Sequence, residues 1–403
     1  MLQPEEFREQ TAAKLLAGIE RATRLRAFVG LDGFVDEIVH VVDKRDDAET
    51  FQRLPTIGKL AERLAGAAGR STNIELVNQR TKLGGNGPIM ANALARLGIK
   101  VTYIGALGYP HLHPVFTEFA RRAEVHSIAE AGHTDALEFD DGKLMLGKTD
   151  HFKEITWENI QLRFGRDRFI QNFSTADFVG FVNWTMVPHM SDLWESLLRE
   201  FCPASTGTRR KIFFDLADPE KRTPRDIARA LELIVGFENY FEVILGLNEK
   251  EAYEIGRVMG LNAADHSRDG LANLAAEIQK RAPVNVLVVH PVSYALAVGD
   301  PALSIVEGPF VEKPLITTGA GDHFNSGFCL GKLLGLDNAA SLLTGVACSG
   351  YYVRSAQSPF VEDLATMLRA WPCRRSCPSS NTAIRSCARK GRGSRRSHRP
   401  SPN

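Results

Sequence analysis

The stretch Thr317-Thr318-Gly319-Ala320-Gly321-Asp322 places two glycines and a carboxylate where a loop gives way to an apolar helix. Apolar side chains recur at helical spacing over residues 323–334, so we expect a helix that begins at the Gly-Ala-Gly turn. Unpaired N–H groups and the helix dipole attract a phosphoryl group there. The pattern indicates a phosphate site that Asp322 faces. It also suits a plain turn, because Asp is a preferred N-cap and glycine is common in turns.

Strand-like runs alternate with helical patterns through most of the chain. Several of these runs are apolar throughout, as expected for strands that helices cover on both faces. We therefore expect an α/β fold, with one three-layer αβα domain over residues 1–371 and a mostly parallel central sheet. The strongest strand candidates are residues 27–30, 101–105, 178–182, 212–215, 243–245 and 286–289.

Two segments interrupt this alternation. Residues 74–79 form a further strand candidate, and residues 136–146 contain the pair Asp141-Gly142, which is typical of a hairpin turn. Residues 142–149 also match the Walker A pattern formally. A P-loop needs small residues between a strand and a helix, whereas Lys-Leu-Met-Leu suits the second strand of the hairpin, so we favour the hairpin.

Composition and charge indicate a folded body followed by a different C-terminal segment. The chain has 403 residues, of which 44% are hydrophobic, enough for a sizeable core. The formal net charge is +1, but residues 372–403 hold nine Lys and Arg and no Asp or Glu, so the remainder carries −8. A mildly acidic body argues against nucleic acid as its partner. We expect residues 372–403 to form a basic disordered tail.

Neither a membrane nor an oxidising compartment is indicated. The N-terminus is acidic, and no apolar run approaches the roughly 18 residues of a membrane span. Cys202, Cys329 and Cys348 lie singly, which suits buried thiols in a reducing compartment, so we expect a cytoplasmic protein. His111 and His113 lack a carboxylate or cysteine at metal-ligand spacing, and we expect a solvated pair.

Polar residues follow several of the expected strands at their carboxyl ends. Ligands gather at that edge of an open α/β sheet. Asp32, Asn248 and His290 each follow one of these strands. Asn183 and Trp184 follow another, where they could bind a ligand or close the edge of the core, and the residues leave this open.

Three ordered segments resemble the signatures of the ribokinase-like (PfkB) carbohydrate kinases. Residues 317–324 resemble the C-terminal signature, and residues 84–87 with 92–98 resemble the N-terminal one. Asn248-Glu249-Lys250-Glu251 is similar to the family's Asn-x-x-Glu motif. Three motifs in the expected order are far more specific than one, and the resemblance spans roughly residues 27–371.

The resemblance implies a small β lid over a sugar. Closing a lid excludes water, which would otherwise compete with the sugar hydroxyl for the phosphoryl group. We expect the lid insertions at approximately residues 37–80 and 132–155. Because exposed sheet edges are often covered by another chain, the lid could equally contact a second copy in a homodimer.

The resemblance also implies a phosphotransferase that moves the terminal phosphate of a nucleotide to a hydroxyl of a sugar or sugar derivative. Asp322 would take the proton of the attacking hydroxyl as general base. The backbone amides of Gly319, Ala320 and Gly321 would form the anion hole. The partners would be a small-molecule sugar and a nucleotide, with no role for a membrane or for nucleic acid.

Sugar contacts carry over to two segments. Asp32 and Asp36, just after the first strand, would accept hydrogen bonds from sugar hydroxyls. Without the family, they would be a turn cap and part of a solvated face. Gly84, Gly85 and Asn86 would supply a second contact, because glycine permits close approach and the amide both donates and accepts.

Metal and nucleotide contacts carry over in the same way. Asn248 and Glu251 would position Mg²⁺ mostly through waters, since Mg²⁺ gives up its hydration reluctantly. Without the family, Asn248 would be a helix N-cap and Glu251 its capping-box partner. The expected nucleotide-binding residues are Asn248, His290, Thr317 and Thr318.

Two departures from the family pattern leave the donor open. Ile316 stands where the C-terminal signature usually opens with Asp, and His290-Pro291 replaces a Thr-x-Gly turn. Residues 30–36 somewhat resemble a segment of ADP-dependent sugar kinases, so ADP is an alternative, but residues 84–98 favour ATP as cofactor. The alternative functions are a catalytically silent sugar- or nucleotide-binding regulator and a nucleoside or vitamin kinase.

Overall fold

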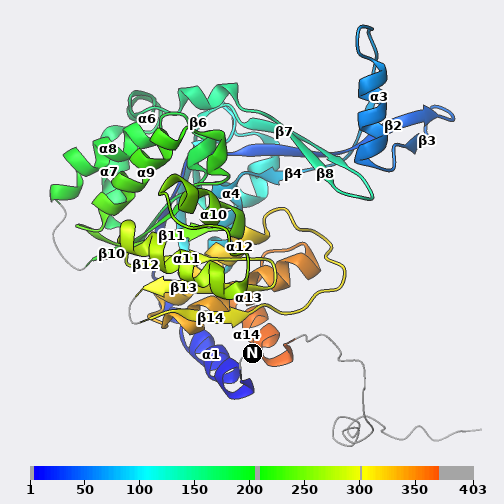
Figure 1. Ribbon diagram of the computed structural model, residues 1–403. Coiled ribbons are helices and arrows are strands. Elements are labelled where there is room, and N and C mark those ends of the chain that lie inside the picture. The colour runs from blue at the N-terminus through cyan, green and yellow to red at the C-terminus, as the bar shows by residue number, and fades with distance from the viewer. Residues whose placement is uncertain (1–3, 205–208, 300–301, 372–403) are drawn as a thin grey trace, which may run out of the picture.

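A large, mostly parallel sheet runs through the centre of the described chain (Figure 1). The computed structural model describes residues 4–204, 209–299 and 302–371, and the expected tail at 372–403 lies outside them. In these residues nine strands follow the order β14-β13-β12-β11-β10-β9-β1-β5-β6, with antiparallel pairing at β12-β13 and β13-β14. They are β1 (Arg26–Gly30), β5 (Lys100–Ala106), β6 (Glu124–Ala129), β9 (Phe178–Phe181), β10 (Arg210–Asp215), β11 (Phe241–Leu247), β12 (Val286–Val289), β13 (Tyr294–Gly299) and β14 (Ser304–Glu307).

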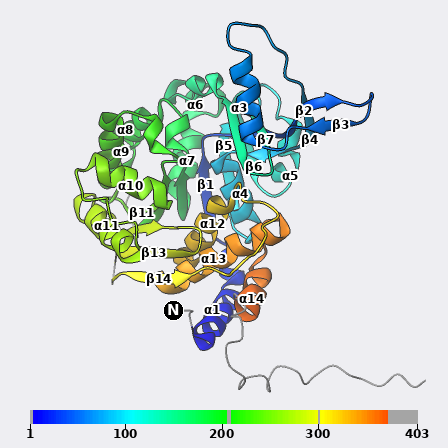
Figure 2. The same ribbon diagram turned by 45° about the vertical axis from the view of Figure 1, so that its right-hand side comes forward.

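Helices cover both faces of this sheet and make the expected three layers (Figure 2). In β10, Ile212 and Phe214 join the core on one face, whereas Phe213 joins the core on the other. This double burial explains why consecutive residues such as Ile212, Phe213 and Phe214 are all apolar. One core contains residues of α6 (Trp157–Arg163), α7 (Arg166–Thr175), α8 (Met190–Glu200), α9 (Pro224–Phe237), α10 (Glu249–Val258) and α11 (Arg268–Arg281). The other contains residues of α1 (Glu5–Ala17), α2 (Ile19–Ala22), α4 (Asn86–Arg96), α5 (Thr117–Ala120), α12 (Ala320–Leu333), α13 (Asn338–Ser355) and α14 (Val361–Ala370).

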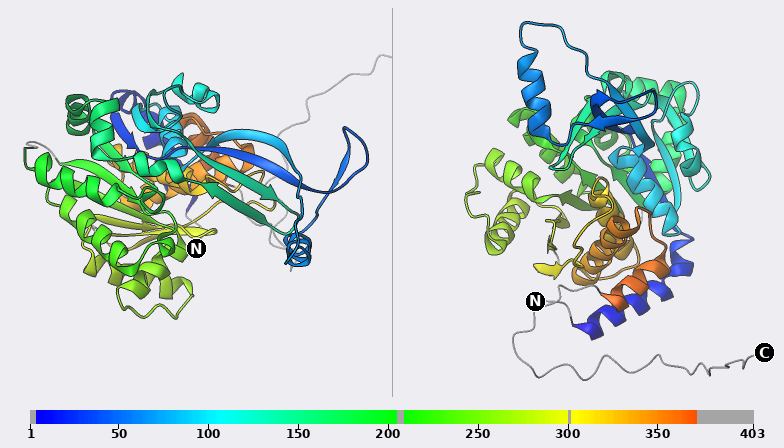
Figure 3. Two further views of the ribbon diagram at one scale, coloured as in Figure 1. Left: turned by 90° about the horizontal axis from the view of Figure 1, so that it is seen from above. Right: turned by 90° about the vertical axis from the view of Figure 1, so that its right-hand side faces the viewer.

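A second, smaller sheet projects from the large one in the manner of a lid (Figure 3). Its strands follow the order β3-β2-β7-β8, and β4 pairs with β2. Val39, Leu60 and Leu137 belong to its own small core, which α3 (Ile57–Gly66) covers. The extents of the lid insertions and a homodimer through the lid stay predictions. The strands are β2 (Phe34–Arg45), β3 (Phe51–Arg53), β4 (Leu76–Gly84), β7 (Gly132–Glu138) and β8 (Lys143–Lys148).

Strand prediction succeeded for the central strands, for β4 and for the hairpin of β7 and β8, and it missed five other strands. Each expected central strand is present, and the hairpin is confirmed, because the Walker A match lies in and beside β8. The prediction missed β2, β3, β6, β13 and β14. In β2 the charged and apolar side chains occur in short runs without a two-residue period, so the sequence carries no alternating signal for this strand. No described helix has both the length and the apolar character that crossing a membrane requires.

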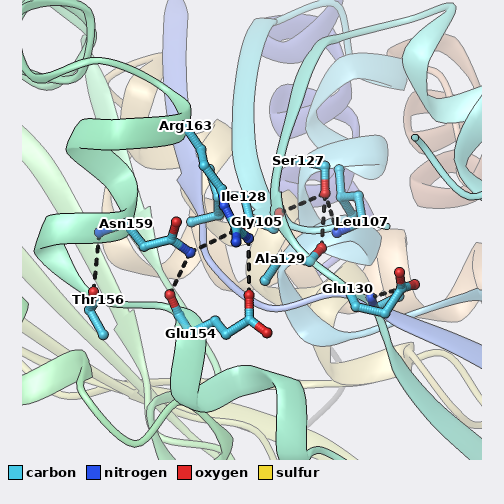
Figure 4. A network of polar contacts seen from close by, with 11 residues as sticks. Gly105, Leu107, Ser127, Ile128, Ala129, Glu130, Glu154, Thr156, Asn159 and Arg163 are labelled. Atoms are coloured by element: carbon cyan, nitrogen blue, oxygen red, sulfur yellow. Dashed lines mark hydrogen bonds and ion pairs between the residues drawn. The ribbon is translucent and has the colours of Figure 1, made fainter. Parts of the chain in front are cut away.

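Polar contacts tie the edge strand β6 to the chain that returns from the second sheet (Figure 4). Arg163 Nη1 donates to Ile128 O at 2.8 Å and pairs with Glu154 at 3.0 Å. Asn159 Nδ2 donates to the same Ile128 carbonyl at 2.9 Å and to Glu154 O at 2.7 Å. These contacts fix the segment after β8 to the large sheet and so help to position the second sheet, to which β7 and β8 belong.

Candidate active site

The Gly-Ala-Gly turn lies at the N-terminus of α12, as predicted. Gly319 is the N-cap residue, with φ 93°, a left-handed conformation that glycine adopts without strain. The N–H of Ala320 donates to Thr317 O at 3.1 Å. The N–H groups of Gly319 and Gly321 make no hydrogen bond with a described residue, so two of the three amides expected in the anion hole are available to a ligand.

Two aromatic side chains hold this turn in place. His323 Nδ1 lies 2.7 Å from Gly319 O, and its Nε2 lies 2.9 Å from Ser358 Oγ. Tyr352 stacks on the His323 ring at 3.7 Å between centroids, and its hydroxyl donates to Thr318 O at 2.9 Å. Burial lowers the pKa of His323 to about 4. The ring is therefore neutral, with one nitrogen donating and the other accepting.

A cavity of about 360 Å³ opens on one side of the turn and is bordered by both sheets. Thr318 and Gly319 form its wall at the turn. The expected site residues Asp36, Gly85, Asn86 and Asp322 all contribute to its lining. We call it the acidic cavity, because its lining includes the carboxylates of Asp36, Asp218, Glu251 and Asp322.

Asp322 and Asn86 meet in the acidic cavity. Asn86 Nδ2 donates to Asp322 Oδ1 at 3.0 Å. Burial raises the pKa of Asp322 to about 8; the Asn86 bond lowers it in part, and the nearby charge of Asp32 raises it. A carboxyl with a pKa near working pH can both accept and release a proton, as a general base requires.

Asp36 reaches the acidic cavity from β2 in the second sheet, whereas we expected it beside the first strand. Its carboxylate lies over Gly84, where an added Cβ would come within 2.3–2.4 Å of the carboxylate atoms. Lys82 Nζ lies 3.8 Å from Asp36 Oδ2. Burial raises the pKa of Asp36, while the charge of Lys82 and a hydrogen bond from Thr134 lower it. The close approach explains why glycine stands at position 84.

Asp32 is fully buried, and protein donors occupy its carboxylate. Oδ1 accepts from Gly87 N at 2.8 Å and from the Tyr103 hydroxyl at 3.4 Å. Oδ2 accepts from Asn86 N at 3.0 Å and from Asn183 Nδ2 at 2.6 Å. Burial raises the pKa of Asp32 to about 6, against the effect of these bonds. Asp32 thus fixes the start of α4 and the Asn183 side chain and does not line the acidic cavity.

Asn183 and Trp184 have separate environments. Asn183 lines the acidic cavity, and its Oδ1 is buried with no hydrogen-bond partner among the described residues. A buried acceptor of this kind suits a ligand hydroxyl. Trp184 is 1% exposed, and its Nε1 donates to Ser191 Oγ at 2.8 Å. For Trp184, the core interpretation is confirmed.

A second cavity, also of about 360 Å³, opens on the other side of the turn. Thr317, Ala320 and Gly321 form its wall at the turn. Asn248 and His290 line it as well, which brings the expected nucleotide contacts together, apart from Thr318 in the acidic cavity. We call it the apolar cavity, because its lining includes Pro291, Val292, Pro309, Val311, Pro314, Phe324 and Val353.

His290 stands against the start of α12. Its ring lies 4.9 Å from the Phe324 ring, and a Cβ on Gly321 would come within 3.1 Å of His290 Cε1. Burial lowers the pKa of His290 to about 4, so the ring is neutral at physiological pH. The apolar cavity therefore gains no positive charge from this histidine.

Asn248 and Glu251 form a capping box at the start of α10. Glu251 N donates to Asn248 Oδ1 at 3.0 Å, and Asn248 N donates to Glu251 Oε2 at 2.8 Å. Asp218 N donates to Glu251 Oε1 at 2.8 Å. The capping interpretation is confirmed, and each oxygen of Glu251 keeps one lone pair for another contact.

The sequence analysis missed several residues at this site. Asp215 ends β10, and burial raises its pKa well above the usual value, as do the charges of Glu251 and Asp322. The rule that ligands gather at strand ends would have found it, because Asp215 closes an expected strand. Thr134 and Lys82 carry no such signal, since they reach the site only through strand pairing with β2.

Comparisons with known proteins agree with this geometry. A family model described as prokaryotic ketohexokinase matches residues 9–371. A ketohexokinase from Haloferax volcanii is 30% identical over 347 residues, which cover 86% of this chain and 91% of that protein.

Solved structures share the fold at low sequence identity. Arabidopsis thaliana ribokinase complexed with ribose and ATP has a TM-score of 0.60 and 15% identity, covering 86% of this chain and 98% of its own. Escherichia coli phosphofructokinase-2 in complex with substrates and products has a TM-score of 0.59 and 14% identity, with the same coverage of 86% and 98%. The chain therefore belongs to the prokaryotic ketohexokinase family, and it is a carbohydrate kinase of the ribokinase-like fold that transfers phosphate from a nucleotide to a sugar.

Proposed function

We propose that this kinase transfers the terminal phosphate of ATP to a hydroxyl of a ketohexose. The observation that supports this most is the meeting of the acidic and apolar cavities at the N-terminus of α12. Sugar hydroxyls need acceptors, a nucleobase needs an apolar slot, and the phosphates between them need donors. The names of the family and of the 30% identical relative support a ketohexose. The ribokinase solved with ATP supports the donor.

In this mechanism Asp322 is the general base. The proton of the attacking hydroxyl passes to an oxygen of Asp322, the hydroxyl oxygen bonds to the terminal phosphorus, and the nucleoside diphosphate leaves. The hydrogen bond from Asn86 fixes the orientation of the carboxylate. Because the pKa of Asp322 is about 8, the fraction of the reactive carboxylate grows as the pH rises through neutrality.

The free amides of Gly319 and Gly321 hold the charge on the phosphoryl group during transfer. The helix dipole of α12 adds to this stabilisation. His323 and Tyr352 keep the turn in the conformation that presents these amides. No covalent intermediate on the protein is required.

The sugar binds in the acidic cavity through acceptors on both sheets. Asp36 supplies a carboxylate from the second sheet, and Asn183 supplies its unpartnered Oδ1 from the large sheet. Asp32 acts indirectly, because it orients Asn183 and the start of α4 through hydrogen bonds. This division modifies the direct sugar contact that the family resemblance implies for Asp32.

Mg²⁺ fits the donor set at the large-sheet side of the acidic cavity. Burial and the charges of Glu251 and Asp322 raise the pKa of Asp215, so a cation there would relieve repulsion among carboxylates. Each carboxylate oxygen of Glu251 already accepts a hydrogen bond from a backbone N–H, which favours contact between Glu251 and Mg²⁺ through water. Asn248, which is the N-cap of the same helix, would assist in the same way. When bound, Mg²⁺ would neutralise charge on the nucleotide phosphates.

A coupled assay on the full chain with Mg²⁺ tests the proposal. ATP and ADP would each be paired with fructose, ribose, fructose 6-phosphate and a nucleoside. We expect the highest kcat/KM for ATP with the ketohexose. A preference for ADP, or for any other acceptor, would overturn that assignment.

The Asp322→Asn variant tests the base. We expect kcat to fall by about 10²- to 10⁴-fold, with nucleotide affinity retained. Asp167→Asn is the matched control, because the Asp167 side chain is fully exposed at 100%. Equal turnover in the two variants would rule out Asp322 as the base.

A further inference from the structure

A third cavity, of about 310 Å³, lies beside the acidic cavity and shares Ile89 with it. It is bordered by β4 of the second sheet, by α4 and the α5 region, which lie near β4 (Figure 2), and by residues 352–358. None of the residues assigned to sugar or phosphate binding above lines it. We call it the basic cavity, because its lining includes Arg80, Lys82, Arg96 and Arg122.

Four cationic side chains and one carboxylate, Glu118, line the basic cavity, so its lining carries excess positive charge. The exposed side chain of Arg80, which lines the cavity, makes no hydrogen bond or ion pair with any described residue. Lys82 is 12% exposed, and its nearest carboxylate, Asp36, lies 3.8 Å away. Glu118 is the acid in the lining, and it is already shared between Arg121 and Arg122. An excess of cations in one cavity favours a bound anion.

Other contacts hold part of the basic cavity in shape before any ligand binds. Arg96 Nε donates to Ser358 O at 3.3 Å, and its guanidinium lies 3.7 Å from the centre of the Phe360 ring. Asn92 Nδ2 donates to Ser358 Oγ at 3.3 Å. The remaining donors of Arg96 therefore have a fixed position, which lowers the entropic cost of binding.

Size and lining narrow the chemistry of the ligand. The lining also includes apolar side chains such as Ile89, Val115 and Phe119. A volume of about 310 Å³ lies at the small end of ligand pockets, which suits a phosphate group with a short carbon skeleton. Guanidinium groups match phosphate oxygens in pairs.

We propose that the basic cavity binds a phosphate group, carried by a small phosphomonoester of sugar-phosphate size, through Arg80, Lys82 and Arg122. This site is separate from the phosphoryl-transfer turn, because the basic cavity shares only Ile89 with the acidic cavity and no residue with the apolar cavity. It adds a second anion site to the kinase without altering the proposed reaction.

Calorimetric titration of the full chain tests this site with three probes: inorganic phosphate, fructose 1-phosphate and uncharged fructose. Arg80→Ala should weaken the binding of inorganic phosphate at least about tenfold, and Arg80→Lys should restore most of it. Arg70→Ala is the matched control, because Arg70 is exposed, lies outside the cavity and stands in the loop between α3 and β4. Melting temperatures of the variants check that each one is folded.

The probes distinguish a free phosphate from a phosphate ester. If fructose 1-phosphate binds more tightly than inorganic phosphate and this binding depends on Arg80, the apolar side chains of the cavity contact the carbon skeleton of a phosphate ester. If the two bind equally tightly, the cavity is a site for free phosphate. If no probe binds, or if Arg80→Ala and Arg70→Ala bind phosphate alike, the proposal is wrong. Since the titration measures binding and not turnover, that failure would leave the proposed kinase reaction untouched.

Discussion

The acidic cavity and the apolar cavity share one turn as a wall, but they are assembled differently. The acidic cavity takes Asp36 and Thr134 from the second sheet and Asp322 from α12, so distant parts of the chain must meet before it exists. The apolar cavity takes its described lining from residues 248–353, beside the large sheet. The acidic cavity therefore depends on how the two sheets are placed relative to each other, whereas the apolar cavity depends on packing beside the large sheet alone.

This difference separates the effects of mutations. Substitutions in the second sheet should change sugar binding, substitutions in α13 should change nucleotide binding, and substitutions behind the shared turn should change both. The predictions below test this division.

Among the substitutions that separate the two cavities, Gly84→Ala should have the largest effect. The new Cβ would lie within 2.4 Å of the Asp36 carboxylate, so Asp36 must leave its position. We expect kcat/KM for the sugar to fall about 100-fold, because small displacements of binding groups cost that much. Nucleotide affinity should stay within about twofold by titration. Gly66→Ala in α3 is the control, since its Cβ meets nothing within 4 Å.

The pH dependence should also separate the two cavities. Since the pKa of Asp322 is about 8, kcat/KM for the sugar should rise about 50-fold from pH 6 to pH 8 and then level off. Affinity for Mg²⁺-saturated nucleotide should change little, because His290, with a pKa of about 4, stays neutral over this range. A flat rate profile would contradict the role of Asp322.

The stability of the fold should also depend on the ionisation of Asp322, but it should fall with rising pH, whereas the activity should rise. The pKa of Asp322 is raised on folding, so between about pH 4 and pH 8 the native state binds a proton that the unfolded chain has lost. Its contribution to the free energy of unfolding therefore falls as the pH rises. Asp322→Asn should melt about 2–4 °C above the parent at pH 8.5 and show no gain at pH 4.5.

A smaller effect is expected on the apolar side. Ser349 lines the apolar cavity from α13, and Ser349→Phe should occupy part of the space. We expect KM for ATP to rise about tenfold, equivalent to about 1.4 kcal/mol, with KM for the sugar unchanged. Ser349→Ala leaves the space open and should resemble the parent. A matching rise in both KM values would break the proposed division.

The smallest effect should come from the residues behind the shared turn. His323→Ala removes the contact with Gly319 O, and we expect kcat to fall about three- to tenfold, with both KM values affected. Tyr352→Phe removes only the hydroxyl bond to Thr318 O and should cost less. Steady-state kinetics with each substrate varied in turn would show whether both cavities respond.

The two aspartates near the first strand show where sequence reasoning reached its limit. Asp32 and Asp36 are both carboxylates in one short segment, and nothing local tells them apart. In the structure, the carboxylate oxygens of Asp32 accept hydrogen bonds from Gly87, Asn183 and other donors of the protein, whereas Asp36 lines the acidic cavity. The distinction arises because β2 pairs with β4 and β7 and leaves the plane of the large sheet.

The sequence by itself determined the helix start at Gly319, the alternation of buried strands and helices, and the family, because these depend on residues that are near one another in the chain. Which carboxylates line the acidic cavity and which amides are free became visible only in the folded structure. Asn86 and Asp322 lie 236 positions apart, and their contact exists only after the second sheet, α4 and α12 have assembled. Local patterns fix what a segment can form, whereas burial and charge at a site depend on every segment around it.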